Sequence, residues 1–194
     1  MLSDWLRGHT RGLVDSAALI LHKLGFTPNS ITLMGTAFMF VIALVLAQGY
    51  LVLGAILIAL AAAFDSLDGG LARLTNRVTP FGAFLDSTAD RWAEGAIYGG
   101  LLWWFTSQGA QLEVMLLYAA IIGSLLVSYT RARAEGLDVE CKVGLFTRFE
   151  RIVVLILGLL SGQMLVALGL LAVLANFTAI QRVWYVYRKT ESFQ

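Results

Sequence analysis

Long apolar segments recur six times along this chain of 194 residues, and they constrain its fold more than any other feature. A transmembrane helix needs roughly 20 mainly apolar residues. Apolar runs separated by short turn-forming stretches cover residues 31–48, 50–72, 80–105, 112–129, 149–160 and 164–185. Charged residues make up only 14% of the chain, against about 25% in ordinary soluble domains. The sequence therefore predicts an all-α integral membrane protein with six transmembrane helices.

The basic residues predict how these helices are oriented. The short connections at 48–49, 106–111 and 161–163 contain no Lys or Arg. Only Arg91 lies well inside a segment, the third; the other basic residues precede the first segment, follow the second or the fourth, stand at the start of the fifth, or close the sixth. Because Lys and Arg accumulate on the cytoplasmic side, we expect a multi-pass protein of the cell membrane with both termini in the cytoplasm.

The residues before the first apolar segment predict a helix that lies on the membrane. Residues 3–23 mix apolar and charged positions at nearly helical spacing, and the apolar stretch Ala17–Leu21 is too short to span. A cleavable signal peptide is disfavoured by Asp4 and Asp15 and by the lack of a small-residue cleavage site. We expect one membrane domain over residues 1–194, with an amphipathic leader at 1–30, a six-span bundle at 31–186 and a cytoplasmic tail at 187–194.

Acidic residues gather where the second apolar segment ends and the third begins. An ionised Asp at the centre of a spanning helix costs about 2.5–3.5 kcal/mol on insertion scales, so such a cluster indicates a watered cavity, an ion site or a proton path. Spacings of three and four residues place two pairs of aspartates each on one helix face. Oxygen ligands without nearby Cys or His suit Mg²⁺, Mn²⁺ or Ca²⁺ and disfavour zinc. Pairing of single acids with neighbouring arginines is the alternative, and it explains the whole set less well. The acids are Asp65, Asp68, Asp86, Asp90 and Glu94.

The aspartates also form a recognisable motif. The chain reads D-S-L-D-G-G-L-A-R at 65–73 and, after a spacer of eight residues, G-A-F-L-D-S-T-A-D at 82–90. This pattern resembles the signature of the CDP-alcohol phosphotransferase family, D-x2-D-G-x2-A-R followed by a spacer and G-x3-D-x3-D, at every fixed position. That family transfers a phosphoalcohol group from a CDP-linked donor to an acceptor hydroxyl and releases CMP. The resemblance implies a metal-dependent phosphatidyltransferase of phospholipid synthesis.

The resemblance further implies roles for individual residues. Asp65, Asp68 and Asp86 would hold two divalent ions, Mg²⁺ or Mn²⁺, on the donor pyrophosphate, and Asp90 would act as general base and also contact a metal. Such ions neutralise charge on the phosphoryl centre and the leaving group, while the base takes the proton of the attacking hydroxyl. The residues expected to bind the nucleotide and the donor phosphates are Pro28, Thr32, Asp68, Gly69, Ala72, Arg73 and Gly82.

Basic residues between the fourth and fifth segments are candidates for binding the acceptor. Arginine offers a planar donor fork that suits phosphate oxygens, and ordinary positive-inside charge is the alternative explanation. The stretch S-Y-T-R-A-R-A-E-G at 128–136, followed by R-F-E-R at 148–151, is similar to phosphatidylinositol phosphate synthases and their archaeal-lipid relatives. That similarity implies inositol 1-phosphate as acceptor and CDP-diacylglycerol or CDP-archaeol as donor, with glycerol 3-phosphate as the alternative acceptor. The expected acceptor phosphate ligands are Arg131, Lys142, Arg148 and Arg151.

A transporter is the alternative from another functional class. A divalent-cation or proton-coupled transporter also places carboxylates in spans, but near the bilayer midplane and in several helices. Here the acids gather toward the basic end of only two helices. We therefore expect as partners a CDP-linked lipid, a phosphorylated polyol and the bilayer, with a homodimer implied by resemblance and no nucleic acid.

Overall fold

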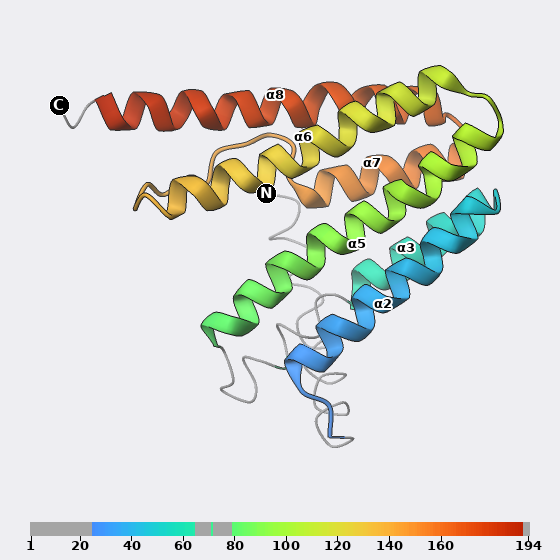
Figure 1. Cartoon of the computed structure of the whole chain (residues 1–194), viewed down its shortest axis with the longest axis horizontal. Helices are drawn as coiled ribbons and strands as arrows, with labels where there is room; N and C mark the ends of the chain where they lie inside the picture. The colour runs from blue at the N-terminus through green and yellow to red at the C-terminus, as the bar shows by residue number, and fades with distance from the viewer. Residues whose placement is uncertain (1–24, 65–70, 72–78, 192–194) are drawn as a thin grey trace. The chain divides into compact units, whose positions relative to one another are not determined.

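The computed structural model describes residues 25–64, 71 and 79–191, and in these ranges all regular structure is helical (Figure 1). The predicted all-α fold is confirmed for this part of the chain. Most of the predicted amphipathic leader lies outside the described residues. The helices are α2 (Pro28–Ala47), α3 (Leu51–Phe64), α5 (Pro80–Ser107), α6 (Gln111–Glu135), α7 (Arg148–Ser161) and α8 (Met164–Glu191).

The described helices follow the predicted apolar segments closely. Three of them, α2, α6 and α8, are long and apolar enough to cross a membrane, and α3 is a shorter apolar helix. The largest departures among the described helices are at the ends of α6 and α8, which continue to Glu135 and Glu191, each six residues past the predicted ends at Tyr129 and Tyr185. The alternating Ala and Arg of 131–134 favour helix, and positive charge near a helix C-terminus is stabilising. Arg131 therefore projects from a rigid helix.

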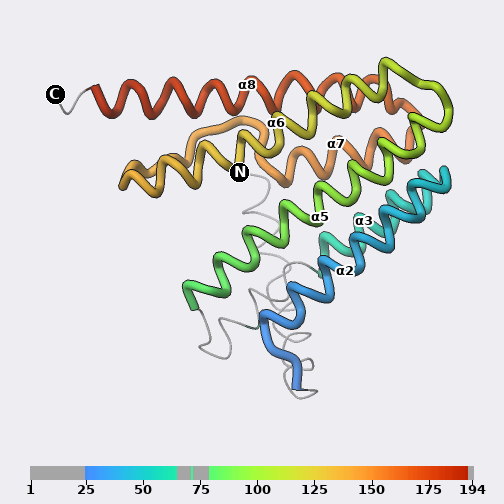
Figure 2. Tube along the Cα trace, in the orientation of Figure 1, coloured from blue at the N-terminus to red at the C-terminus, as the bar shows by residue number. Residues whose placement is uncertain are grey.

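The chain divides into two compact units, residues 1–101 and 102–194. In the first unit, α2 and α3 pack together as a hairpin (Figure 2). Their turn is closed by the N–H of Gly49, which donates to the carbonyl of Leu46 at 2.9 Å. Helix α5 approaches α2 closely at Gly100, where a Cβ would lie 2.2 Å from the carbonyl oxygen of Ala43.

In the second unit, α8 packs along both α6 and α7 (Figure 1). The crossing of α6 and α8 is tight, because a Cβ on Gly123 would come within 2.7 Å of Asn176 Nδ2 and 2.8 Å of the Cβ of Ala175. The same approach lets Asn176 Nδ2 donate to the carbonyl of Ala119 on α6 at 2.9 Å. Small residues and interhelical hydrogen bonds of this kind hold membrane helices together, where apolar burial alone gives little drive.

Candidate active site

The start of α5 positions three of the residues predicted to bind the donor and the metals. Thr79 Oγ1 accepts a hydrogen bond from the N–H of Gly82 at 3.0 Å, and Pro80 occupies the first helical position, as is favourable at a helix N-terminus. From this fixed start, Gly82, Asp86 and Asp90 follow at intervals of four residues. They therefore lie along one face of the helix. Asp86 is exposed, and the Asp90 side chain is 17% exposed.

The first turn of α2 adjoins the first turn of α5. A Cβ on Gly82 would lie 3.4 Å from Asn29 Oδ1, which is ordinary van der Waals contact, so the side chain of Asn29 neighbours the backbone at Gly82. The start of α2 is itself fixed by Thr27 and Ser30, whose side chains accept from each other's backbone N–H at 2.9 and 3.2 Å. Pro28 is thus brought into the neighbourhood of Gly82, and Asn29 is a candidate donor-site residue that the sequence analysis did not single out.

Two further polar contacts lie along α5 next to the predicted base. Arg91 Nη1 stands 3.8 Å from Asp90 Oδ2, which is an ion pair beyond hydrogen-bonding distance, and it also donates to the carbonyl of Ser87. Further along α5, toward its C-terminus, the hydroxyl of Tyr98 donates to Glu94 Oε1 at 3.3 Å. Asp90 therefore pairs with an arginine, as the alternative explanation for these acids expected of single residues.

The other half of the aspartate motif lies outside the described residues. This applies to Asp65, Asp68, Gly69, Ala72 and Arg73, so the binding of metal ions by all four aspartates of the motif stays a prediction. Within the described ranges no three Asp, Glu, His or Cys side chains group to hold a metal. What α5 contributes is a pair of carboxylates one turn apart, and carboxylate oxygens are the ligands that Mg²⁺ and Mn²⁺ prefer. The carboxylates of Asp86 and Asp90 are therefore suitable ligands for these ions.

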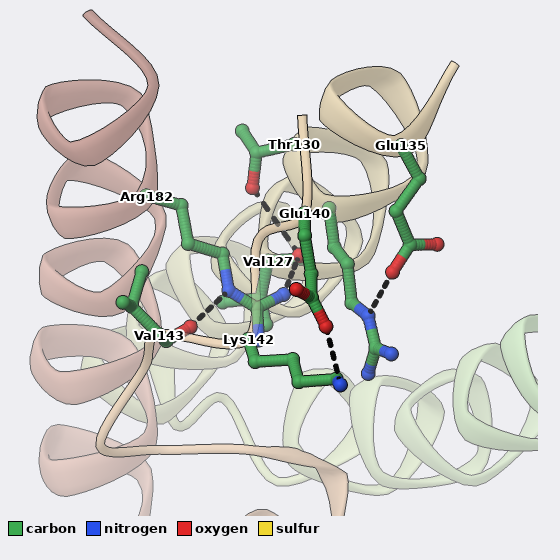
Figure 3. A network of polar contacts seen from close by, with 8 residues as sticks. Val127, Thr130, Glu135, Glu140, Lys142, Val143 and Arg182 are labelled. Carbon is green, nitrogen blue, oxygen red and sulfur yellow. Dashed lines mark hydrogen bonds and ion pairs between the residues drawn. The ribbon is translucent and has the colours of Figure 1, made fainter. Parts of the chain in front are cut away.

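The predicted acceptor residues belong to the second unit, around the loop of residues 136–147. Arg131 Nε, on the last turns of α6, donates to Glu135 Oε1 at 2.8 Å, and both side chains are about half exposed. In the loop, Lys142 forms an ion pair with Glu140 (Figure 3). The Lys142 ammonium lowers the pKa of Glu140 below its ordinary value, and Glu140 raises the pKa of Lys142. Both groups are therefore charged at neutral pH.

Arg182 on α8 is the site residue that the sequence analysis missed. Its side chain is buried at 4% exposure, Nε donates to the carbonyl of Val143 at 2.9 Å, and Nη1 donates to the carbonyl of Val127 (Figure 3). One guanidinium thus ties the loop to α6 and α8. In the sequence, Arg182 is one of the basic residues near the end of the sixth apolar segment. Its position three residues before the end of an apolar run was the available signal, because a charge at such depth needs specific partners.

The remaining predicted cations stand at the start of α7. Glu150 Oε2 accepts from the N–H of Thr147 at 2.8 Å, which fixes the first turn that carries Arg148 and Arg151. Arg151 is 1% exposed. The charges of Arg131 and Arg151 both act on Arg182, and Arg131 also acts on Lys142. The second unit therefore gathers the cations Arg131, Lys142, Arg151 and Arg182 into one neighbourhood, the cation cluster, in which the carboxylates of Glu135 and Glu140 also lie.

Comparisons with known proteins agree with this chemistry. The family model of the CDP-alcohol phosphatidyltransferases matches residues 26–184. The archaetidylinositol phosphate synthase of Methanothermobacter thermautotrophicus is 38% identical over 88% of this chain and 88% of its own. The phosphatidylinositol phosphate synthase of Mycobacteroides abscessus is also 38% identical, over 88% of this chain and 82% of its own.

Solved structures are similar over nearly the same length. The crystal structure of the Mycobacterium tuberculosis phosphatidylinositol phosphate synthase with CDP-DAG bound superposes with a TM-score of 0.86 at 32% identity, covering 90% of this chain and 93% of that one. The same enzyme in complex with manganese and citrate gives a TM-score of 0.85 over 90% of this chain and 88% of that one. The predictions of a multi-pass membrane protein and of a phosphatidyltransferase enzyme are confirmed, and the chain belongs to the CDP-alcohol phosphatidyltransferase family.

Proposed function

We propose that this protein transfers the phosphatidyl-type group of a CDP-linked lipid, CDP-diacylglycerol or CDP-archaeol, to a hydroxyl of inositol 1-phosphate and releases CMP. The observation that carries the proposal is the match, over 88% of the chain, to synthases named for an inositol phosphate product. The cation cluster of the second unit supports an acceptor that already bears a phosphate, since guanidinium and ammonium groups form charge-assisted hydrogen bonds with phosphate oxygens.

The face of α5 that carries Gly82, Asp86 and Asp90 supplies the chemistry on the donor side. The hydroxyl oxygen of the acceptor forms a bond to the phosphorus that bears the lipid, the bond from that phosphorus to CMP breaks, and Asp90 takes the hydroxyl proton. Asp86, with Asp65 and Asp68, would hold two divalent ions, which when bound neutralise charge on the pyrophosphate. Gly82 and the first turn of α2 leave room for the nucleotide near the backbone.

Two isosteric substitutions on α5 test these roles. Asp90→Asn removes the proton acceptor but keeps the shape, so turnover should be lost while metal-dependent binding of CDP-diacylglycerol persists. Asp86→Asn removes a metal ligand, so both donor binding and turnover should fall. The measurements are CMP release and calorimetric binding of the donor in the presence of Mn²⁺. Near-normal turnover by Asp90→Asn would show that another group is the base.

Acceptor identity is tested by competition among phosphorylated polyols. Purified protein in lipid nanodiscs receives CDP-diacylglycerol with inositol 1-phosphate, glycerol 3-phosphate or unphosphorylated inositol. We expect inositol 1-phosphate to support CMP release with the lowest KM of these three compounds. A lower KM for glycerol 3-phosphate would instead identify a phosphatidylglycerophosphate synthase. Metal flux in liposomes without any nucleotide chemistry would favour a transporter.

The finer membrane arrangement belongs to the same proposal. Residues 1–194 would form one membrane domain with six crossings in the cell membrane, an amphipathic leader before α2, both termini in the cytoplasm, and a homodimer as the assembly. The apolar helices and the absence of Lys and Arg from residues 106–111 and 161–163 support it. In a Cys141→Ala background, a cysteine at Ser107 should react with an impermeant maleimide from outside intact cells, and one at Thr190 should react only after lysis.

A further inference from the structure

The cation cluster of the second unit already holds two anionic partners of its own. Arg131 pairs with Glu135 at 2.8 Å, and Lys142 pairs with Glu140 (Figure 3). Arg182 differs from both, since its Nε and Nη1 donate to backbone carbonyls, which carry no net charge. The exposed Arg131 and Lys142 thus have carboxylate counter-ions, whereas the buried Arg182 is held by the dipoles of backbone carbonyls.

These two ion pairs can be opened at little cost. The side chains of Arg131 and Glu135 are 50% and 48% exposed, and those of Lys142 and Glu140 are 75% and 65% exposed. Water solvates all four groups when they separate, so such pairs contribute little net free energy. Arg182 has no such freedom, because its partners are fixed backbone groups and its side chain is buried.

An arriving phosphate and the two glutamates compete for the same donors. A phosphate monoester carries a charge of about −1.5 to −2 at neutral pH and offers three acceptor oxygens. Arg131 Nε carries one N–H, so a phosphate can take it only if Glu135 Oε1 moves away. Lys142 Nζ carries three N–H donors, so there the phosphate competes with Glu140 for the position and the charge of the ammonium group. Since like charges repel, each glutamate that stays nearby also weakens binding of the phosphate.

We propose that Glu135 and Glu140 are internal counter-anions that hold Arg131 and Lys142 in the empty site and are displaced by the acceptor's phosphate, which sets the acceptor KM. The inference rests on the proposed function, because it assumes that this cluster binds the acceptor. It assigns the two glutamates a role opposite to that of ligands: their loss strengthens acceptor binding.

The experiment compares Glu140→Gln and Glu135→Gln with Asp138→Asn. Asp138 stands in the same loop, makes no ion pair among the described residues, and has φ 58°, a conformation that Asn tolerates well. Asp138→Asn removes one negative charge, as each glutamine substitution does, and is therefore the matched control. The readouts are the KM for inositol 1-phosphate at saturating CDP-diacylglycerol and the inhibition constant of inorganic phosphate against that acceptor.

We expect both glutamine variants to lower the acceptor KM and the phosphate inhibition constant by about twofold to fivefold, the range of exposed ion pairs. The KM for the donor should not change, and Asp138→Asn should have a smaller effect. In 1 M salt, which screens charges beyond about 3 Å, the differences should narrow. An acceptor KM that is unchanged or raised in Glu140→Gln would overturn the proposal.

The phosphate readout separates this inference from the proposed function. If the wild-type protein uses glycerol 3-phosphate instead of inositol 1-phosphate, the acceptor assignment fails, but the glutamine variants should still bind inorganic phosphate more tightly. If inorganic phosphate competes equally well in all variants while inositol 1-phosphate is the acceptor, the proposed function stands and the counter-anion role is wrong.

Discussion

Gly144→Ala should release the loop of residues 136–147 from α8. Gly144 has φ +140°, a conformation that L side chains rarely adopt, and a Cβ there would lie 2.9 Å from Thr178 Cγ2 and 3.2 Å from Arg182 Nη2. Thr178 is fully buried and cannot turn outward. The added methyl group must therefore push the loop away from α8, which breaks the 2.9 Å hydrogen bond from Arg182 Nε to the carbonyl of Val143.

The cost to the docked loop follows from these two changes. A non-glycine residue in such a backbone region costs about 1–3 kcal/mol. A hydrogen bond from a charged donor contributes about 1.5–3 kcal/mol. Since relaxation relieves part of each, we take about 2–4 kcal/mol as the loss of docking free energy. Because each 1.4 kcal/mol is a factor of ten in an equilibrium constant, the undocked population should rise about 30-fold to 1,000-fold.

Cys141 reports this equilibrium directly, because it is the only cysteine of the chain, lies three residues before Gly144 and is fully buried. Its reaction with a thiol reagent such as DTNB requires the loop to open, so the labelling rate follows the open population when closing is fast. Gly162→Ala is the matched control, with φ +72° and open space around its Cβ. Gly144→Ala should react at least about 30 times faster than wild type. A rate within twofold of wild type, or an equal rise in Gly162→Ala, would refute the reasoning.

Three further outcomes are expected. Gly123→Ala should lower the free energy of unfolding by about 1–3 kcal/mol, because the new Cβ would lie 2.7 Å from Asn176 Nδ2. The control is Gly169→Ala, whose Cβ would meet nothing within 4 Å and should leave stability unchanged or raise it. Thermal denaturation of both variants is the measurement. Arg148→Ala should raise the acceptor KM and leave the donor KM unchanged; an unaltered acceptor KM would remove this arginine from the pocket. Removal of divalent ions with EDTA should abolish CMP release, and Mn²⁺ or Mg²⁺ should restore it; activity that survives EDTA would contradict the metal assignment.

The helices were predictable from the sequence because one physical rule dominates them. In a bilayer every backbone polar group must be paired within the chain, so an apolar run is a helix wherever it is long enough. This is why α5 begins at Pro80 as predicted and ends only two residues beyond Phe105. The end of α6 was missed because Arg131 and Arg133 stop the apolar run without stopping the helix. Hydropathy shows where a segment leaves the hydrocarbon core of the bilayer, whereas the helix propensity of the residues and the capping of the last turn decide where the helix ends.

The donor and acceptor sites differ in how far local spacing could define them. On α5, a repeat of four residues fixes Gly82, Asp86 and Asp90 on one face, so three members of the motif could be placed from the sequence alone. The acceptor cluster depends on contacts between residues far apart in the chain. Arg182 donates to backbone carbonyls 39 and 55 residues earlier, and no spacing rule connects a guanidinium to a carbonyl that any residue type can present. Because Arg182 donates to backbone carbonyls, no pairing of charged side chains in the sequence reveals the contact. Gly144 marks it only indirectly, as the position where the approach of Arg182 leaves no room for a side chain.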